Sequence, residues 1–344
     1  MTLSPLLQHE LSFDPQARFV LFGGGRLLLE MARRASANGH AVVAVCGPVH
    51  AAESIAGVPL RDALAGLGVA VIETSSLAVE TLTDLVESTT IGMSLSAPWI
   101  FRPNVIGLFG GRLLNVHGTD LPHNRGGGGF TWQILRGDRR GGLSLHVLTA
   151  EVDVGELVLQ RTFTYPDACR TPADFLAHRE EHEHAFLDTL LDAIARGEAL
   201  SVVAQDESRA VYWPRINTAV NGFIDWSWTA EEIVRFCDAF GSPHAGAGTF
   251  LRDAEVRIAR CDVGASDGEF HPFQAGLVFR AHDGAFHVAA RGGSVIIRVV
   301  TDGDREDCAA RVRCGSRFHT PPDVLDRARR ARPVITADGT RVRE

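Results

Sequence analysis

Three side chains of the types that catalyse acyl transfer lie in one part of the sequence. Asn115 and His117 flank Val116 at the end of an apolar run, and Asp153 follows His117 by 36 positions. Residues two apart in a strand point to the same face, so Asn115 and His117 are expected to share one. An amide can polarise a carbonyl, an imidazole can move a proton, and a carboxylate can fix the tautomer of that imidazole. No nucleophilic Ser or Cys lies nearby, so the chemistry would be direct attack of a bound substrate on a bound acyl donor.

A structural interpretation of the same residues stays open. His117 would then be a core histidine whose hydrogen bonds are satisfied, and Asp153 would be a turn residue before Gly155. The spacing alone does not separate the two interpretations. Four successive glycines, at 126–129, lie between His117 and Asp153 and form a segment whose backbone can approach a ligand closely.

The elements before Asn115 must place it at the edge of a sheet. Residues 18–22 form a short apolar run that ends at glycines 23–25, and a helical pattern and a second apolar run at 41–47 follow. A strand, a helix and a strand within about thirty residues indicate parallel strands joined by a right-handed crossover. The pattern continues to residue 95 and predicts a doubly wound, mostly parallel α/β sheet, whose carboxyl edge is where such sheets hold ligands. The three glycines lack the G-x-G-x-x-G spacing, so we interpret them as a tight turn.

The second half of the chain changes character. A strong helix over 172–195 is followed by the polar stretch 205–210, and Thr229 with Glu232 forms a capping box for one more helix. Short β-like runs separated by Gly and Asp turns come after it. We predict a catalytic domain over 1–205, a smaller β-rich, OB-like carboxyl-terminal domain over 206–320, and a basic, partly mobile tail over 321–344.

Composition and charge restrict the partners. The formal net charge of -8 disfavours an obligate nucleic-acid binder. The sequence shows no signal peptide and no run of about 18 apolar residues. Its six cysteines are scattered without a C-x-x-C pair, which excludes a disulfide or zinc framework. We expect a cytoplasmic protein with small-molecule partners and no membrane contact; the oligomeric state stays open, a homo-oligomer included.

Two motifs resemble those of the formyltransferases that use 10-formyltetrahydrofolate. Residues 115–126 read N-V-H-G-T-D-L-P-H-N-R-G and residues 152–156 read V-D-V-G-E, where the family has N-x-H-x-S-L-L-P-x-x-R-G and L-D-T-G-D. The resemblance, which covers about residues 17–262, is to methionyl-tRNA and sugar N-formyltransferases. It implies a formyltransferase-type Rossmann-like fold, 10-formyltetrahydrofolate as co-substrate without a metal, and Asn115, His117 and Asp153 as the catalytic trio.

The resemblance also implies where two ligands would bind. The pterin ring would lie against the strand and loop before Asn115 and against the loop around Asp153. The acceptor amine would lie near the loop after His117, where Asp120 replaces an apolar residue of the family and could hold a cationic group. The candidate residues for the pterin are Met93, Leu95, Pro98, Trp99, Ile100 and Val152, and those for the acceptor are Thr119, Asp120 and Arg125.

The acceptor is predicted to be a small amine. Methionyl-tRNA formyltransferases carry a basic insertion after the second strand, whereas this chain has no Arg between Arg34 and Arg61. We therefore expect an amino-sugar nucleotide or a hydroxylamine-bearing amino acid, and no tRNA. The alternatives are a methionyl-tRNA formyltransferase with an unusual surface and a folate-binding protein without turnover.

One further pattern has metal-ligand spacing. His178, Glu181 and His182 fit the H-x-x-E-H arrangement of some metallohydrolases. The apolar positions of this helix are needed for packing, and its charged residues indicate a solvated face. We expect a structural helix here and no metal.

Overall fold

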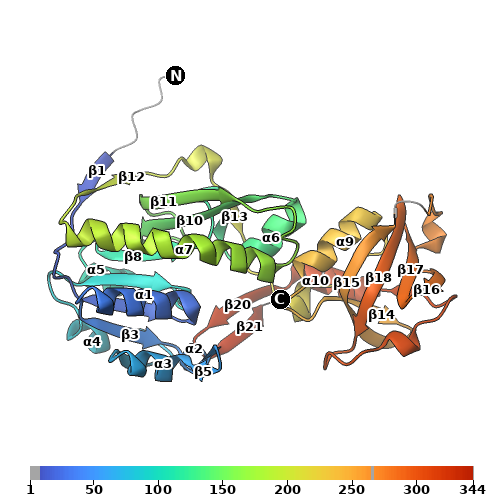
Figure 1. The fold of residues 1–344 in the computed structure, drawn as a ribbon, viewed down its shortest axis with the longest axis horizontal. Coiled ribbons are helices and arrows are strands. Elements are labelled where there is room, and N and C mark those ends of the chain that lie inside the picture. The colour runs from blue at the N-terminus through green and yellow to red at the C-terminus, as the bar shows by residue number, and fades with distance from the viewer. Residues whose placement is uncertain (1–7, 265–266, 344) are drawn as a thin grey trace, which may run out of the picture.

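The structure is a computed structural model that describes residues 8–264 and 267–343 of the chain. An α/β domain and a smaller β-rich domain lie side by side, and the chain returns at its end to the region between them (Figure 1). This order confirms the predicted fold class. The boundary at residue 205 stays a prediction.

The first domain is built on a mixed sheet, in which the described residues contribute nine strands in the order β1-β12-β11-β10-β8-β7-β2-β3-β6. The strands from β8 to β6 are parallel, as predicted, and those from β10 to β1 are antiparallel. The strands are β1 (Gln8–Leu11), β2 (Phe19–Gly23), β3 (Val42–Cys46), β6 (Ala70–Glu73), β7 (Ile91–Leu95), β8 (Leu113–His117), β10 (Arg140–Val147), β11 (Leu157–Thr164) and β12 (Leu200–Val203).

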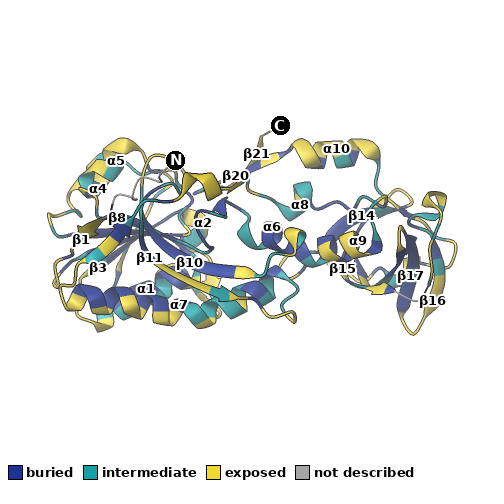
Figure 2. Ribbon diagram, turned by 90° about the horizontal axis from the view of Figure 1, so that it is seen from above, coloured by how far each residue is buried: buried dark blue, intermediate teal, exposed yellow. Residues whose placement is uncertain are grey.

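Helices cover both faces of this sheet. Helices α1 and α7 lie on one face and α4 and α5 on the other (Figure 2). Helix α7 begins where Thr171 and Asp174 form a capping box, and Phe186 and Leu190, four residues apart, pack into the main core. The helices of this domain are α1 (Gly25–Ala37), α2 (Pro48–Ala51), α3 (Leu60–Gly66), α4 (Val79–Thr83), α5 (Pro103–Leu108), α6 (Gly129–Arg136) and α7 (Pro172–Ala195). The short strand pairs are β4 (Ser54–Ile55) with β5 (Val58–Pro59), and β9 (Arg125–Gly126) with β13 (Tyr212–Trp213).

The turn from β2 into α1 requires glycine. Gly23 has a φ of 124°, and a Cβ atom there would lie 2.1 Å from the carbonyl oxygen of Leu95. The glycines after β2 therefore form the tight turn that the sequence predicted, and they bring the start of α1 close to the end of β7.

The second domain is a curled antiparallel sheet packed against helix α9. Its order is β16-β17-β18-β15-β14-β19, and a bridge between Leu277 and Arg317 joins the two edges toward a barrel. The predicted capping box of Thr229 and Glu232 is present at the start of α9. The elements are α8 (Thr218–Asn221), α9 (Ala230–Ala239), β14 (Ala247–Leu251), β15 (Ala254–Gly264), β16 (Val278–His282), β17 (Ala285–Ala290), β18 (Gly293–Thr301) and β19 (Phe318–His319).

The segment predicted as a basic tail has regular structure. It forms α10 (Pro322–Arg330) and a hairpin of β20 (Arg332–Thr336) and β21 (Gly339–Arg343). Val324 and Ala328, one helical turn apart, pack against Phe223 of the second domain. The sequence analysis predicted a tail because the segment is rich in arginine, and it did not consider the apolar residues that lie between the arginines. None of the described helices is long and apolar enough to cross a membrane.

Candidate active site

Asn115 and His146 are directly opposite each other on the neighbouring strands β8 and β10. The Nδ1 atom of His146 lies 2.9 Å from the carbonyl oxygen of Val147, so it must carry the proton that this carbonyl accepts. The Nε2 atom of His146 is then an acceptor, and the side-chain amide of Asn115 donates to it at 3.0 Å. This pairing fixes which side of the Asn115 amide faces the site.

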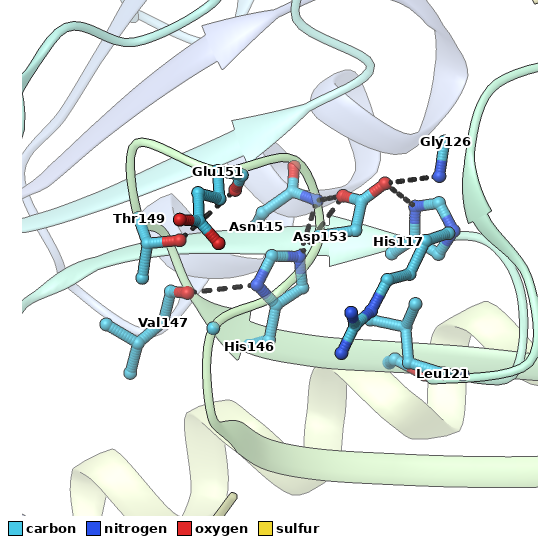
Figure 3. Close-up of polar contacts among 12 residues, drawn as sticks. Asn115, His117, Leu121, Gly126, His146, Val147, Thr149, Glu151 and Asp153 are labelled. Atoms are coloured by element: carbon cyan, nitrogen blue, oxygen red, sulfur yellow. Dashed lines mark hydrogen bonds and ion pairs between the residues drawn. The ribbon is translucent and has the colours of Figure 1, made fainter. Parts of the chain in front are cut away.

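Asp153 lies in the loop between β10 and β11, and its carboxylate faces the side chains of Asn115 and His117 on β8. Its φ of 57° is left-handed, a conformation that Asp tolerates better than most residues. One oxygen of the carboxylate accepts a hydrogen bond from the backbone N–H of Gly126 at 2.8 Å, and the other accepts a long one from the side-chain amide of Asn115 at 3.4 Å (Figure 3). The side-chain amide of Gln205 donates to the carbonyl oxygens of Asp153 and Gly155 at 2.8 and 2.7 Å, and so holds the loop in place.

His117 completes the group. Its Nε2 atom lies 2.7 Å from the carbonyl oxygen of Asn124 and donates to it, while Nδ1 faces the carboxylate of Asp153 at 3.6 Å. In the neutral ring, Nδ1 therefore carries the free lone pair. The three residues of the predicted trio converge, and Nδ1 of His117 is placed to accept a proton beside a carboxylate.

Burial and charge set the protonation states of this pair. Burial lowers the pKa of His117 below its ordinary value of 6.5, although Asp153 opposes the shift. Burial alone would raise the pKa of Asp153, but attraction to His117, the contact with His146 and the hydrogen bond from Gly126 outweigh it and lower this pKa to about 2. At neutral pH the site therefore holds a neutral imidazole next to an ionised carboxylate.

A cavity of about 440 Å³ opens above these residues. The loop after β7 and the loop after β10 form part of its wall. The remaining wall comes from the glycine segment after β9, from β13, from α2 and from the C-terminal hairpin. Its lining includes Ser94, Trp99, Ile100, Val152, Gly126, Tyr212, Arg215, His50 and Ile335.

The structure divides the residues predicted to bind the pterin. Trp99, Ile100 and Val152 line the cavity. Met93 and Leu95 are fully buried in the main core, because side chains alternate along β7 and Ser94 between them is the one that faces the cavity. Pro98 is buried and is not among the lining residues.

Thr119, Asp120 and Arg125, predicted to bind the acceptor, are buried and do not line the cavity. The hydroxyl of Thr119 donates to the same carbonyl of Asn124 that His117 uses. Because this loop folds inward, its polar groups face protein partners and not a ligand, and of the three side chains only Oδ1 of Asp120 is buried without a partner among the described residues. These residues support the catalytic loop.

Asp120 and Arg125 each have charged partners inside the protein. Asp120 pairs with Arg140 at 2.6 Å and with His123 at 3.0 Å, and burial raises the pKa of its carboxyl group. Arg125 donates to the side-chain oxygen of Gln205 at 2.9 and 3.1 Å and pairs with Glu207 at 2.6 Å. Arg125 thus holds the glutamine that braces the Asp153 loop.

Sequence reasoning missed His146, Gln205 and Ile335. His146 has one signal in the sequence: it is a polar residue in an apolar strand seven positions before Asp153. Gln205 lies in a polar stretch that was interpreted only as a domain boundary. Ile335 belongs to the segment that was interpreted as a tail, so no local pattern pointed to the cavity.

The H-x-x-E-H helix uses its histidines for packing. The ring of His182 stacks on Phe163 with centroids 4.0 Å apart, and His178 lies edge-on to the same ring at 5.7 Å. Among the residues that the structure describes, no group of three His, Cys, Asp or Glu side chains could hold a metal ion.

Comparisons with known proteins identify the family of this chain. The family model "Formyl transferase" matches residues 18–189, and "Formyl transferase, C-terminal domain" matches residues 217–315. The methionyl-tRNA formyltransferase of Roseiflexus sp. (strain RS-1) is 30% identical over 264 residues, which are 76% of this chain and 79% of that protein.

Solved structures show the same fold. The N-formyltransferase from Helicobacter canadensis, in complex with folinic acid and dTDP-3-aminofucose, has a TM-score of 0.62 at 17% identity and covers 82% of this chain and 98% of its own. HypX from Aquifex aeolicus, in complex with tetrahydrofolic acid, has a TM-score of 0.51 at 17% identity and covers 92% of this chain and 48% of its own. The chain belongs to the formyl transferase family, whose members are enzymes that transfer formyl groups.

Proposed function

We propose that this enzyme transfers the formyl group of 10-formyltetrahydrofolate to the amine of a small acceptor. The observation that carries the proposal is the convergence of Asn115, His117 and Asp153 at the base of one cavity. A neutral imidazole and an ionised carboxylate are the states that direct attack by an amine requires. The arrangement needs no nucleophilic side chain.

The cavity wall suits a flat ring system on one side. Ile100 exposes 72% and Val152 41% of their surfaces, which is high for apolar residues, and Trp99 lines the same cavity. A pterin between the loops that carry these residues would cover them. The formyl group on N10 of the folate would then lie next to Asn115.

The trio would act on the bonds that change. As the amine nitrogen attacks the formyl carbon, the oxygen gains negative charge, which the N–H of Asn115 that faces Asp153 at 3.4 Å can stabilise once it donates to the substrate instead. The nitrogen loses a proton to Nδ1 of His117, and Asp153 stabilises the imidazolium that forms. The C–N bond to the folate then breaks, and the folate nitrogen takes a proton, giving tetrahydrofolate and the formamide.

The structure also supports a small acceptor over a tRNA. The C-terminal hairpin covers the segment after β3, where Ala337 is only 2% exposed and lies against Gly47. This is the position at which the resemblance places a basic insertion in methionyl-tRNA formyltransferases. The alternative, methionyl-tRNA as acceptor, is favoured by the 30% identity to a methionyl-tRNA formyltransferase.

We further propose that the protein works in a reducing compartment such as the cytoplasm. All six cysteines are free, and Cys46, Cys237, Cys261 and Cys308 are buried.

A panel of amines tests the proposal. Amino-sugar nucleotides, hydroxylamines and amino acids are incubated with 10-formyltetrahydrofolate, and release of tetrahydrofolate is followed. Transfer to a small amine is the expected result. Formylation of charged initiator tRNA at a rate above that of every small amine would establish the alternative, and folate binding without transfer to any acceptor would refute both.

A further inference from the structure

The C-terminal hairpin, β20 with β21, lies outside both segments that the family models match. Figure 1 shows it beside α2 of the first domain, at the end of a chain that has just passed through the second domain. The hairpin therefore reaches back to the domain that holds the active site.

The tip of the hairpin is docked by specific contacts. The hydroxyl of Ser75 donates to the carboxylate of Asp338 at 2.5 Å. A Cβ atom at Gly47 would lie 3.0 Å from the Cβ of Ala337, and Ala337 is nearly inaccessible to solvent. The hairpin tip thus rests on the carboxyl ends of β3 and β6.

Helix α10, which leads into the hairpin, is bound to the second domain. Arg329 on α10 pairs with Asp225 at 2.8 Å. The side-chain amide of Asn221 donates to the carbonyl oxygens of Ala328 and Ala331 at 2.8 and 3.2 Å. With both its base and its tip held, the hairpin spans the two domains as a strap.

One side chain of the strap reaches the active-site cavity. Ile335 on β20 lines it together with His50 of α2 and is 38% exposed. Val342 on β21 is similarly exposed, at 45%, but is not a lining residue. The strap therefore presents Ile335 to the cavity, and Val342 offers a matched control.

The order of the strands tells which ligand Ile335 would meet. The loops expected to hold the pterin follow β7 and β10, which are the two neighbours of β8 in the sheet. His50 follows β3, which lies beyond β7 and β2. The loop after β7 reaches the hairpin, because Nε1 of Trp99 donates to the carbonyl oxygen of Ser75 at 3.2 Å and the hydroxyl of Ser75 donates to Asp338 at the hairpin tip. The part of the cavity under Ile335 thus borders the loop after β7 and lies on the opposite side of β8 from the loop after β10.

We propose that the C-terminal hairpin forms a wall of the acceptor subsite and that Ile335 is a specificity-determining residue that limits the size of the amine. The proposal rests on the proposed function, because it needs an amine acceptor. An apolar wall at this end admits a small acceptor and excludes a macromolecular one.

Substitutions of Ile335 test the role in specificity. Ile335→Trp should lower kcat/KM for the largest amine that the wild type formylates by about tenfold, mainly through KM, while hydroxylamine is used within about twofold of wild type. Ile335→Ala should shift preference toward the larger amine. Val342→Trp should change neither, and the Kd for folinic acid should stay within about twofold in all variants. Unchanged ratios between the two amines, or a loss of folinic acid binding equal to the loss of activity, would overturn the proposal.

A cross-link tests the docked position without any transfer assay. Gly47 has a φ of -70°, which any residue adopts, and the 3.0 Å between the Cβ positions has to open to the roughly 3.8 Å of a disulfide for Gly47→Cys combined with Ala337→Cys to link. Mild oxidation should join the two cysteines, as shown by peptide mass mapping, and either single variant should give no link. No link in the double variant would overturn the docked hairpin. If the wild type formylates no amine, the proposed function and the specificity role fail together, whereas this experiment still decides whether the strap docks.

Discussion

The side-chain amide of Asn115 donates a hydrogen bond to Nε2 of His146 at 3.0 Å, across the antiparallel pair β8 and β10. The backbone carbonyl of Val147 holds the other nitrogen of His146 and so determines which nitrogen accepts. An amide has two N–H groups, and the second one of Asn115 donates to Oδ1 of Asp153 at 3.4 Å, a long hydrogen bond that the oxygen of a formyl group would displace or share. The histidine orients a residue of the trio without belonging to it.

The trio itself predicts the largest effects. His117→Ala and Asn115→Ala should each lower kcat by at least about 10²-fold, because their interactions strengthen as charge develops on the oxygen. The Kd for folinic acid should change by no more than several-fold, measured by equilibrium binding. Near-normal turnover in both variants would contradict the assigned roles.

His146 should act through Asn115. His146→Ala removes the acceptor that orients the amide, and we expect kcat to fall about tenfold with KM for the folate little changed. His146→Gln offers an amide oxygen in place of Nε2, so it should recover part of the loss. A purely structural role for His146 would instead lower the melting temperature of both variants without separating their kcat values.

The pH profile should report the pair His117 and Asp153. Proton acceptance requires neutral His117, so kcat should fall on acidification through a pKa below 6.5, since burial lowers it. Asp153, with a pKa of about 2, stays ionised over this range and holds the pKa of His117 up. Asp153→Asn removes that charge, so the acidic limb should move to lower pH while kcat drops. A limb at unchanged pH would show that the charge of Asp153 does not act on His117.

Local sequence patterns predict part of the site and part of the fold. The resemblance of two short motifs predicts that Asn115, His117 and Asp153 act together, and the structure brings them together, although their catalytic role stays a prediction. The parallel strands were predicted because their apolar runs alternate with helical patterns. His146 and Gln205 were missed because their partners are set by antiparallel pairing and by a contact across 52 positions between Gln205 and Asp153. Such partners depend on register and chain return, which local patterns do not encode.

The burial of Asp120 changes what its substitution should do. The sequence suggested a contact with the acceptor, but the carboxylate pairs with Arg140 and His123 inside the protein. Asp120→Asn should therefore leave KM for the acceptor within about twofold and lower the free energy of unfolding by no more than about 1 kcal/mol, because Arg140 is half exposed and its charge stays solvated without the partner. Urea unfolding and steady-state kinetics on the same preparation measure the two effects. A selective rise in KM for the amine would restore the acceptor role of Asp120.

The histidines of α7 are predicted to pack and not to bind a metal. His182 stacks on Phe163, and its Nε2 atom is buried without a partner among the described residues, so the ring serves packing rather than the cavity chemistry. His182→Ala should lower the free energy of unfolding by about 1 kcal/mol through the lost stacking and leave kcat unchanged. His182→Phe should keep both, because a phenyl ring can occupy the same stack without the unpaired nitrogen. Dialysis against a chelator should leave turnover as it was. Activity lost on dialysis and restored by zinc in the wild type, but not in His182→Phe, would assign the H-x-x-E-H residues a metal.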